Sequence, residues 1–249
     1  MVTLQLHPHK QPTVLEAIAV WCACLLVGAV GSTYYPDLWS PLGVGLSMTL
    51  MALLLIATLA TLVRHYDLPH FGWANTITMV RATGVCWLAG VGIGHEEPLS
   101  ADAAWTVAIA ALILLLVDGL DGWIARKTAY CSRFGARFDM EVDAALSLVL
   151  AYLAWQNGMF GAWVLLLGLF RPAFVLAGKI WPSLTSPLPE SFARKTVCVI
   201  QIASLITLQL PFTQGEIGQW IAGFALALIT WSFGRDTLYL MNQARGKRS

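Results

Sequence analysis

Eight apolar runs occupy most of this 249-residue chain, and they restrict its fold more than any other feature. Each is about 20 residues long, which is the length that an α-helix needs to cross the hydrocarbon core of a bilayer. Charged residues make up only 12% of the chain, against about 25% in a soluble domain. The sequence therefore predicts an all-α integral membrane protein with about eight transmembrane helices, at about 13–32, 41–63, 74–94, 103–124, 135–156, 160–179, 194–211 and 216–241.

Four aspartates interrupt this apolar pattern: Asp118, Asp121, Asp139 and Asp143. At 100° per residue, the first two share one face of a helix and the last two share a face of the next helix. Ionisable groups at or inside a bilayer are costly and are functional by default. Four facing carboxylates would repel one another, and divalent cations remove that conflict. Oxygen ligands without Cys or His favour Mg²⁺, Mn²⁺ or Ca²⁺ over zinc.

The residues between the aspartates suit a phosphate-bearing ligand. Gly122 and Ala125 share the face of the first two aspartates, and Gly135 shares that of the last two. Glycines at these positions leave room for a bulky ligand beside the backbone. Arg126 supplies a planar fork of donors that matches phosphate. Metal, phosphate and arginine together are the apparatus of phosphoryl transfer.

These residues follow the spacing D-x2-D-G-x2-A-R-x8-G-x3-D-x3-D, which resembles the signature of the CDP-alcohol phosphatidyltransferases, also called phosphotransferases. The resemblance extends from about residue 71 to 241 and implies a six-helix catalytic core, to which two N-terminal helices are added. We therefore predict an N-terminal part, 1–63, with a tail and the two extra helices. The catalytic membrane domain, 64–249, would begin with a short interfacial segment and end with a basic tail.

The third apolar run begins with ANTITMVR, which is similar to the family's N-x-x-T-x-x-R element beside the nucleotide site. The family's preceding proline is replaced by Ala74. An alternative interpretation of this segment is a helix N-terminus that is capped on the cytoplasmic side. The resemblance implies a set of residues that bind the nucleotide and the donor phosphates: Asn75, Thr78, Arg81, Gly122, Ala125, Arg126 and Gly135.

The resemblance implies transfer of a phosphatidyl group from CDP-diacylglycerol to a small alcohol, with release of CMP. It implies Mg²⁺ or Mn²⁺, two ions per site, held by the four aspartates. Asp143 is also the implied general base, because metal-bound carboxylates lose basicity and the last of the row is the least engaged. The family is typically homodimeric. A formal net charge of +1 gives no reason to expect a nucleic-acid partner.

The acceptor alcohol stays open at this point. Ala144 stands where glycerophosphate enzymes of the family usually carry Lys and inositol-phosphate enzymes carry Arg. Arg171, Arg194 and Lys195 argue in the other direction, since basic groups could hold an acceptor phosphate. They are our candidate acceptor contacts. Serine, choline, glycerol phosphate and inositol phosphate are all compatible with these residues.

Three alternatives stay open as well. In the reversed chemistry of the family, a CDP-aminoalcohol donates its head group to diacylglycerol. A metal-ion transporter could also use the four carboxylates, although it would typically carry ionisable residues along a path through the bilayer. In a purely structural alternative, the aspartates pair with arginines of their own stretch, Arg126, Arg133 and Arg137.

The distribution of basic residues predicts the orientation in the membrane. The connections on one side contain none of the 15 Lys and Arg residues; they are about 33–40, 95–102, 157–159 and 212–215. Because cytoplasmic loops carry the excess of basic residues, this side is the outer one. We therefore expect a protein of a bacterial inner membrane, with the aspartates and both termini facing the cytoplasm.

Overall fold

A computed structural model describes the chain over residues 11–35, 38–65, 70–95, 97–128, 133–186, 188–189, 191–213 and 215–246. Side chains are described over the same ranges, with the exception of residues 11, 12, 64, 65, 120–128, 133, 185, 245 and 246.

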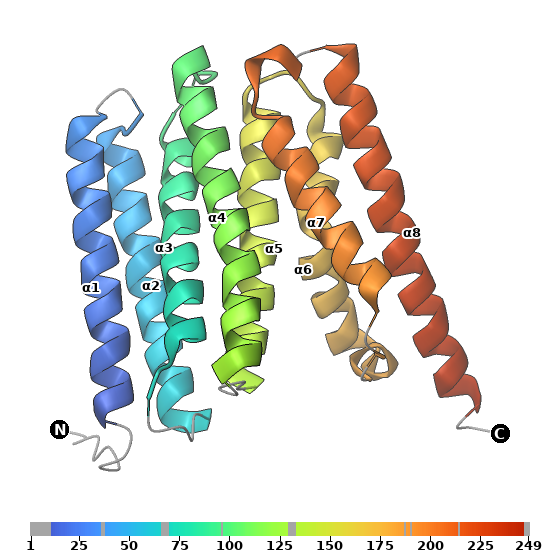
Figure 1. The fold of residues 1–249 in the computed structure, drawn as a ribbon. Helices are drawn as coiled ribbons and strands as arrows, with labels where there is room; N and C mark the ends of the chain where they lie inside the picture. The colour runs from blue at the N-terminus through green and yellow to red at the C-terminus, as the bar shows by residue number, and fades with distance from the viewer. Residues whose placement is uncertain are drawn as a thin grey trace. The chain divides into compact units, whose positions relative to one another are not determined.

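Over the described ranges the fold is all-helical (Figure 1). The α-helices are α1 (Gln11–Tyr34), α2 (Pro41–His65), α3 (Trp73–Gly94), α4 (Ala101–Thr128), α5 (Arg133–Gln156), α6 (Leu165–Ile180), α7 (Phe192–Thr207) and α8 (Glu216–Gly246). Three short 3-10 helices accompany them: η2 (Ala162–Val164), η3 (Pro182–Thr185) and η4 (Pro211–Thr213). Each helix coincides with one predicted span, with ends that differ by a few residues, so the predicted all-α membrane fold is confirmed.

Six segments of the described chain are long and apolar enough to cross a membrane, and they correspond to α1, α2, α3, α4, α8 and α6 with its preceding 3-10 turn. The two other helices differ from them for physical reasons. Helix α7 has 16 residues and is about 24 Å long, which is less than the hydrocarbon thickness of about 30 Å. Helix α5 carries five charged residues in its first half, Arg133, Arg137, Asp139, Glu141 and Asp143.

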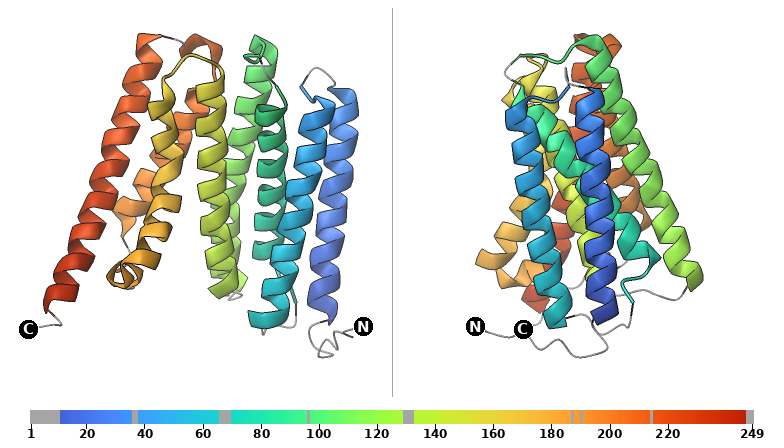
Figure 2. Two further views of the ribbon diagram at one scale, coloured as in Figure 1. Left: turned by 180° about the vertical axis from the view of Figure 1, so that it is seen from behind. Right: turned by 90° about the vertical axis from the view of Figure 1, so that its left-hand side faces the viewer.

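The helices form two compact units. The first contains the chain up to residue 96 together with 109–143, and the second contains 97–108 together with 144–249. In the first unit α1, α2 and α3 pack against one another, as both views in Figure 2 show. In the second unit α8 packs against α6 and α7, and the 3-10 turns contact α6 and α8. All of the predicted metal ligands belong to the first unit.

Helices α2 and α3 approach closely at two glycines. A Cβ atom added at Gly43 would lie 2.5 Å from the carbonyl oxygen of Gly90. A Cβ atom at Gly90 would overlap the hydroxyl of Ser47 and the carbonyl oxygen of Gly43. Small residues at a membrane helix contact let two backbones meet without intervening side chains. The backbone of the extra helix α2 therefore packs directly against the backbone of α3.

Helix α1 is tied to the start of α3 through Glu16. Its Oε2 accepts a hydrogen bond from the backbone N–H of Phe71 at 2.8 Å, and its Oε1 lies 2.9 Å from Nδ1 of His70. The side chain of Asn75 donates in turn to the carbonyl oxygen of Phe71 at 2.6 Å. The N-cap residue of α3 is Gly72, whose φ is 82°, and no side chain forms a capping hydrogen bond there. The start of α3 is thus held by α1 and by Asn75 rather than by an N-cap side chain.

A small hydrophobic core lies at this end of the first unit. It is formed by buried side chains from α1, α2 and the start of α3, namely Ala17, Leu62, Phe71 and Met79. The rings of Phe134 and Phe138 from α5 pack against it, with 5.5 Å between their centroids. Through this core the beginning of α5 packs against the beginning of α3. These two helices carry most of the charged residues that are described in the next subsection.

Candidate active site

Three helices of the first unit bring charged side chains together: Arg81 from α3, Asp118 from α4, and Asp139 and Asp143 from α5. At a rise of about 1.5 Å per residue, these positions lie about 9 to 15 Å from the start of α3, the end of α4 and the start of α5. Helix geometry therefore places all four groups in one layer of the unit. Asp139 and Asp143 share a face because they are four residues apart.

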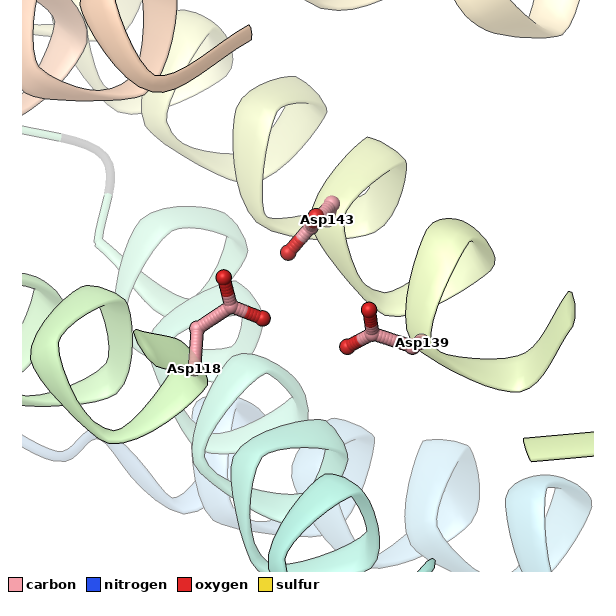
Figure 3. A group of neighbouring side chains, drawn as sticks. All are labelled: Asp118, Asp139 and Asp143. Atoms are coloured by element: carbon pink, nitrogen blue, oxygen red, sulfur yellow. The ribbon is translucent and has the colours of Figure 1, made fainter. Parts of the chain in front are cut away.

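The three carboxylates converge, as Figure 3 shows. One oxygen from each of Asp118, Asp139 and Asp143 lies within 4.8 Å of the other two. Their side chains are 25%, 34% and 30% exposed, so they are accessible to a ligand without being free in solvent. Oxygen ligands of one Mg²⁺ or Ca²⁺ ion lie at about 2.0–2.6 Å from it, and two of them are thus at most about 5 Å apart. The three residues fit a hard divalent cation.

Arg81 lies against all three carboxylates, and its side chain is fully buried. Its Nη1 forms ion pairs with Asp118 and with Oδ1 of Asp139, the latter at 2.5 Å. Its Nη2 donates to Oδ1 of Asp143 at 2.5 Å, and its Nε donates to the carbonyl oxygen of Leu114 at 3.2 Å. Removing a guanidinium from water costs about several kcal/mol of free energy, and ion pairs and hydrogen bonds such as these offset that cost.

These four described side chains together carry an excess of negative charge. One guanidinium faces three carboxylates, which leaves a formal charge of −2 on the group when all are ionised. Carboxylates this close repel one another, and the repulsion grows where water is scarce. The arrangement therefore suits a divalent cation, which would neutralise this excess charge.

Two further predicted donor contacts lie on the same face of α3 as Arg81. Asn75 and Thr78 are both buried, and both bond to backbone carbonyls of the preceding turn. The hydroxyl of Thr78 donates to Ala74 at 3.0 Å. Spacings of three residues keep the three side chains within one third of the helix circumference. Their contact with a nucleotide stays a prediction.

Part of the predicted motif has only its backbone described. Asp121, Gly122, Ala125 and Arg126 lie in the last turns of α4, and their side chains are outside the described residues. Gly135 lies on α5 one turn before Asp139 and hence on the same face. The structure thus brings together three of the four predicted metal ligands and leaves the place of the Asp121 carboxylate a prediction.

The three candidate acceptor contacts belong to the second unit. The Nε of Arg194 lies 2.9 Å from Oδ2 of Asp236 on α8, and its Nη2 donates to the carbonyl oxygen of Pro189 at 2.8 Å. Arg171 is half-buried on α6, and Lys195 is exposed at the start of α7. Their role in acceptor binding stays a prediction, and for Arg194 it would require a change of partner.

The contact of Arg81 with the aspartates is the feature that the sequence did not indicate. The sequence placed Arg81 among the donor contacts, and the structural alternative paired the aspartates with Arg126, Arg133 and Arg137. Of these three, Arg137 has a described side chain, and it is exposed. A signal was nevertheless present, because a basic group deep in an apolar helix needs an anion at the same depth. The aspartates are such anions.

Comparison with known families agrees with this geometry. The family model for CDP-alcohol phosphatidyltransferase matches residues 71–231, about two thirds of the chain, and this segment includes Arg81 and all four aspartates. Neither a curated protein nor a solved structure matches the chain. The resemblance drawn from the motif is thereby confirmed. The aspartate cluster sits within the matched segment of an all-helical membrane chain, and the chain belongs to the CDP-alcohol phosphatidyltransferase family.

Proposed function

We propose that this protein transfers a phosphatidyl group from CDP-diacylglycerol to a small alcohol and releases CMP. Membership of the family supports transfer of a phosphate-linked group from a CDP-alcohol. One observation carries the proposal further: oxygens of Asp118, Asp139 and Asp143 lie within 4.8 Å of one another in a single layer. One guanidinium does not balance three carboxylates held this close together, and binding a metal–diphosphate substrate would use the remaining negative charge.

The proposed metal ligands are Asp118, Asp121, Asp139 and Asp143, for two Mg²⁺ or Mn²⁺ ions. When bound, such ions neutralise the diphosphate and stabilise the charge that develops on the leaving group. Three of the four residues supply oxygens at separations that fit, and the fourth is one turn beyond Asp118 on α4. All are hard oxygen donors, which favours these ions over zinc.

In the proposed reaction Asp143 is the general base. Its carboxylate takes the proton of the acceptor hydroxyl, and the acceptor oxygen forms a bond to the phosphorus of the phosphatidyl group. The bond from that phosphorus to the bridging oxygen breaks, and CMP leaves with this oxygen. Asp143 is farther from the start of α5 than Asp139, which supports a position nearer the lipid-embedded part of the donor.

The proposed donor contacts surround the cluster. Gly122, Ala125 and Gly135 would line the cytidine pocket, and Thr78 and Arg126 would contact the phosphates. Asn75 and Arg81 would complete this set from α3. Because the aspartates occupy the guanidinium of Arg81, its contact with the donor requires that it release at least one of them. Arg171, Arg194 and Lys195 are the proposed contacts of the acceptor.

We further propose an inner-membrane enzyme whose active site and termini face the cytoplasm, and which acts as a homodimer. Six apolar helices make it an integral membrane protein, and the absence of Lys and Arg from one set of connections supports the orientation. The proposed division into an N-terminal part, 1–63, and a catalytic part, 64–249, is supported by a family match that begins at residue 71.

The test is an assay of the purified protein in lipid nanodiscs. CDP-diacylglycerol is offered with serine, choline, glycerol phosphate or inositol phosphate, and CMP release and new lipids are followed by mass spectrometry. The Asp139→Asn variant is the matched inactive control. We expect one acceptor to yield a new phospholipid together with CMP. Product that forms only from a CDP-aminoalcohol and diacylglycerol would replace this proposal with the reversed family chemistry. Metal transport into sealed vesicles without any lipid product would replace it with a transporter.

A further inference from the structure

Arg81 is distinguished from the other basic residues by its burial. Among the described side chains it is the fully buried cation, at 0% exposure, whereas Arg194 and Arg235 are about one third exposed. It lies on α3, and the groups that it contacts belong to α4 and α5. It therefore connects three helices of the first unit at the level of the aspartates.

Every nitrogen of its guanidinium is used. Nε bonds to the carbonyl oxygen of Leu114, Nη1 pairs with Asp118 and Asp139, and Nη2 bonds to Asp143. A guanidinium presents its donors in a rigid planar fork, which a flexible ammonium group cannot reproduce. The fork thus sets the spacing between the carboxylates of α4 and α5.

The same carboxylates are the ones that fit a divalent cation. A cation bound there would lie close to the guanidinium, and like charges repel strongly in a place with little water. Without a metal ion, on the other hand, the carboxylates would repel one another if Arg81 were removed. The guanidinium and a metal ion would therefore each neutralise negative charge of the same carboxylates.

We propose that Arg81 is the resident cation of this cluster: it holds the carboxylates of Asp118, Asp139 and Asp143 together before metal binds, and it gives up at least one of them when a divalent ion binds. Arg81 is on this view a positioning residue, which acts through the aspartates. The inference rests on the proposed metal-dependent function, and it assigns to Arg81 a role that differs from a contact with the donor.

The test compares metal binding and metal-free stability in full-length variants in nanodiscs. Arg81→Met removes the charge and keeps much of the length of the side chain. Arg81→Lys keeps the charge but loses the fork. Met79→Ala is the matched control, because Met79 is fully buried two residues away on α3 and belongs to the hydrophobic core. Bound Mn²⁺ is measured by electron paramagnetic resonance, and thermal unfolding is measured in EDTA and in Mn²⁺.

For Arg81→Met we expect Mn²⁺ to bind at least about tenfold more tightly than in the wild type, because a competing positive charge is gone. We also expect its melting temperature to fall in EDTA and to recover most of the loss in Mn²⁺. Arg81→Lys should lie between the two proteins in both measurements. Met79→Ala should lower the melting temperature equally in EDTA and in Mn²⁺, with unchanged Mn²⁺ affinity.

Two results for the wild type and Arg81→Met would overturn the inference, and they are distinguishable. If the wild type and Arg81→Met bind Mn²⁺ with the same affinity, the metal-dependent function stands and the role of Arg81 as resident cation is wrong. If neither protein binds Mn²⁺, the proposed metal site fails and the inference fails with it. Should Arg81→Met not fold, an Arg81→Lys variant with wild-type Mn²⁺ affinity and wild-type stability in EDTA would overturn the inference equally.

Discussion

Asp139 and Asp143 lie one helical turn apart on α5, and both contact the guanidinium of Arg81. Their neighbour Glu141 is exposed, because it is about 200° away on the same helix. Two nearly equivalent carboxylates are therefore available for proton transfer and for metal binding. The proposal assigns proton transfer to Asp143 and metal binding foremost to Asp139.

Replacement by asparagine should separate these roles. Asn keeps the shape of the side chain but cannot take up a proton near neutral pH. We expect Asp143→Asn to lower turnover by about 10² or more, the usual scale for loss of a general base, with little change in CDP-diacylglycerol binding. Asp139→Asn should weaken donor binding as well as turnover. CMP-release rates and donor binding are measured on both variants, and equal losses of donor binding would show that Asp143 is foremost a metal ligand.

Removal of the metal should act on the cluster as a whole. We expect EDTA to abolish CMP release and Mg²⁺ or Mn²⁺ to restore it, because the diphosphate would otherwise approach a group with a formal charge of −2. Calcium added at the same concentration tests whether geometry matters beyond charge, since it takes longer and more numerous oxygen contacts. Activity that persists after exhaustive chelation would contradict the metal site.

At the scale of helices, the two extra N-terminal elements are part of the support of the site. Helix α2 meets α3 backbone to backbone at Gly43 and Gly90, and α1 holds the start of α3 through Glu16. Arg81 is carried by this same helix α3. Helices α1 and α2 thus hold α3, the helix that carries Arg81, in addition to anchoring the chain in the bilayer.

Two alanine substitutions test this packing. Gly90→Ala should destabilise the protein by about 1–3 kcal/mol, because the new methyl group would overlap Ser47 and the backbone of Gly43. Gly45→Ala on α2 is the matched control: a Cβ there meets nothing within 4 Å, and alanine is favoured over glycine in a helix by about 1 kcal/mol. Thermal unfolding in nanodiscs measures both. Equal melting temperatures for the two variants would contradict a close contact between α2 and α3.

At the scale of the whole molecule, the distribution of charge makes a prediction about orientation. Basic residues are absent from one set of connections, and the aspartate motif belongs to the opposite side. Under this prediction the proposed site faces the cytoplasm. The fold is compatible with either orientation, since six apolar helices cross a bilayer equally well in both.

Cysteine labelling decides the orientation. In a variant without other cysteines, Thr128→Cys at the end of α4 should react with an impermeant maleimide in inside-out vesicles and not in right-side-out vesicles. A matched control is Ser100→Cys, which lies just before the start of α4 and should show the opposite pattern. Labelling of Thr128→Cys from the outside of right-side-out vesicles would reverse the predicted topology.

Much of this protein is readable from the sequence because the relevant physics is local. Bilayer thickness sets the length of a spanning helix, so the apolar runs locate α1 to α8. Helix α5 is less apolar because it carries five charged residues in its first half, and α7, with 16 residues, is shorter than the hydrocarbon core is thick. Helical periodicity likewise places Asp139 and Asp143 on one face before any contact is known.

What the aspartates contact follows from tertiary packing. Arg81 is 58 residues from Asp139 and 62 from Asp143 in the sequence, and no periodicity relates residues on different helices. Their contact depends on how α3 packs against α4 and α5. Gly84 of α3 lies close to Leu114 of α4, and Phe134 and Phe138 of α5 pack against the core around Phe71 and Met79. Which residues are charged, and at what distance from the helix ends they lie, can be predicted from the sequence alone. Packing determined that a cation from α3 holds together the anions of α4 and α5, because a buried charge is stable only where opposite charges lie within reach.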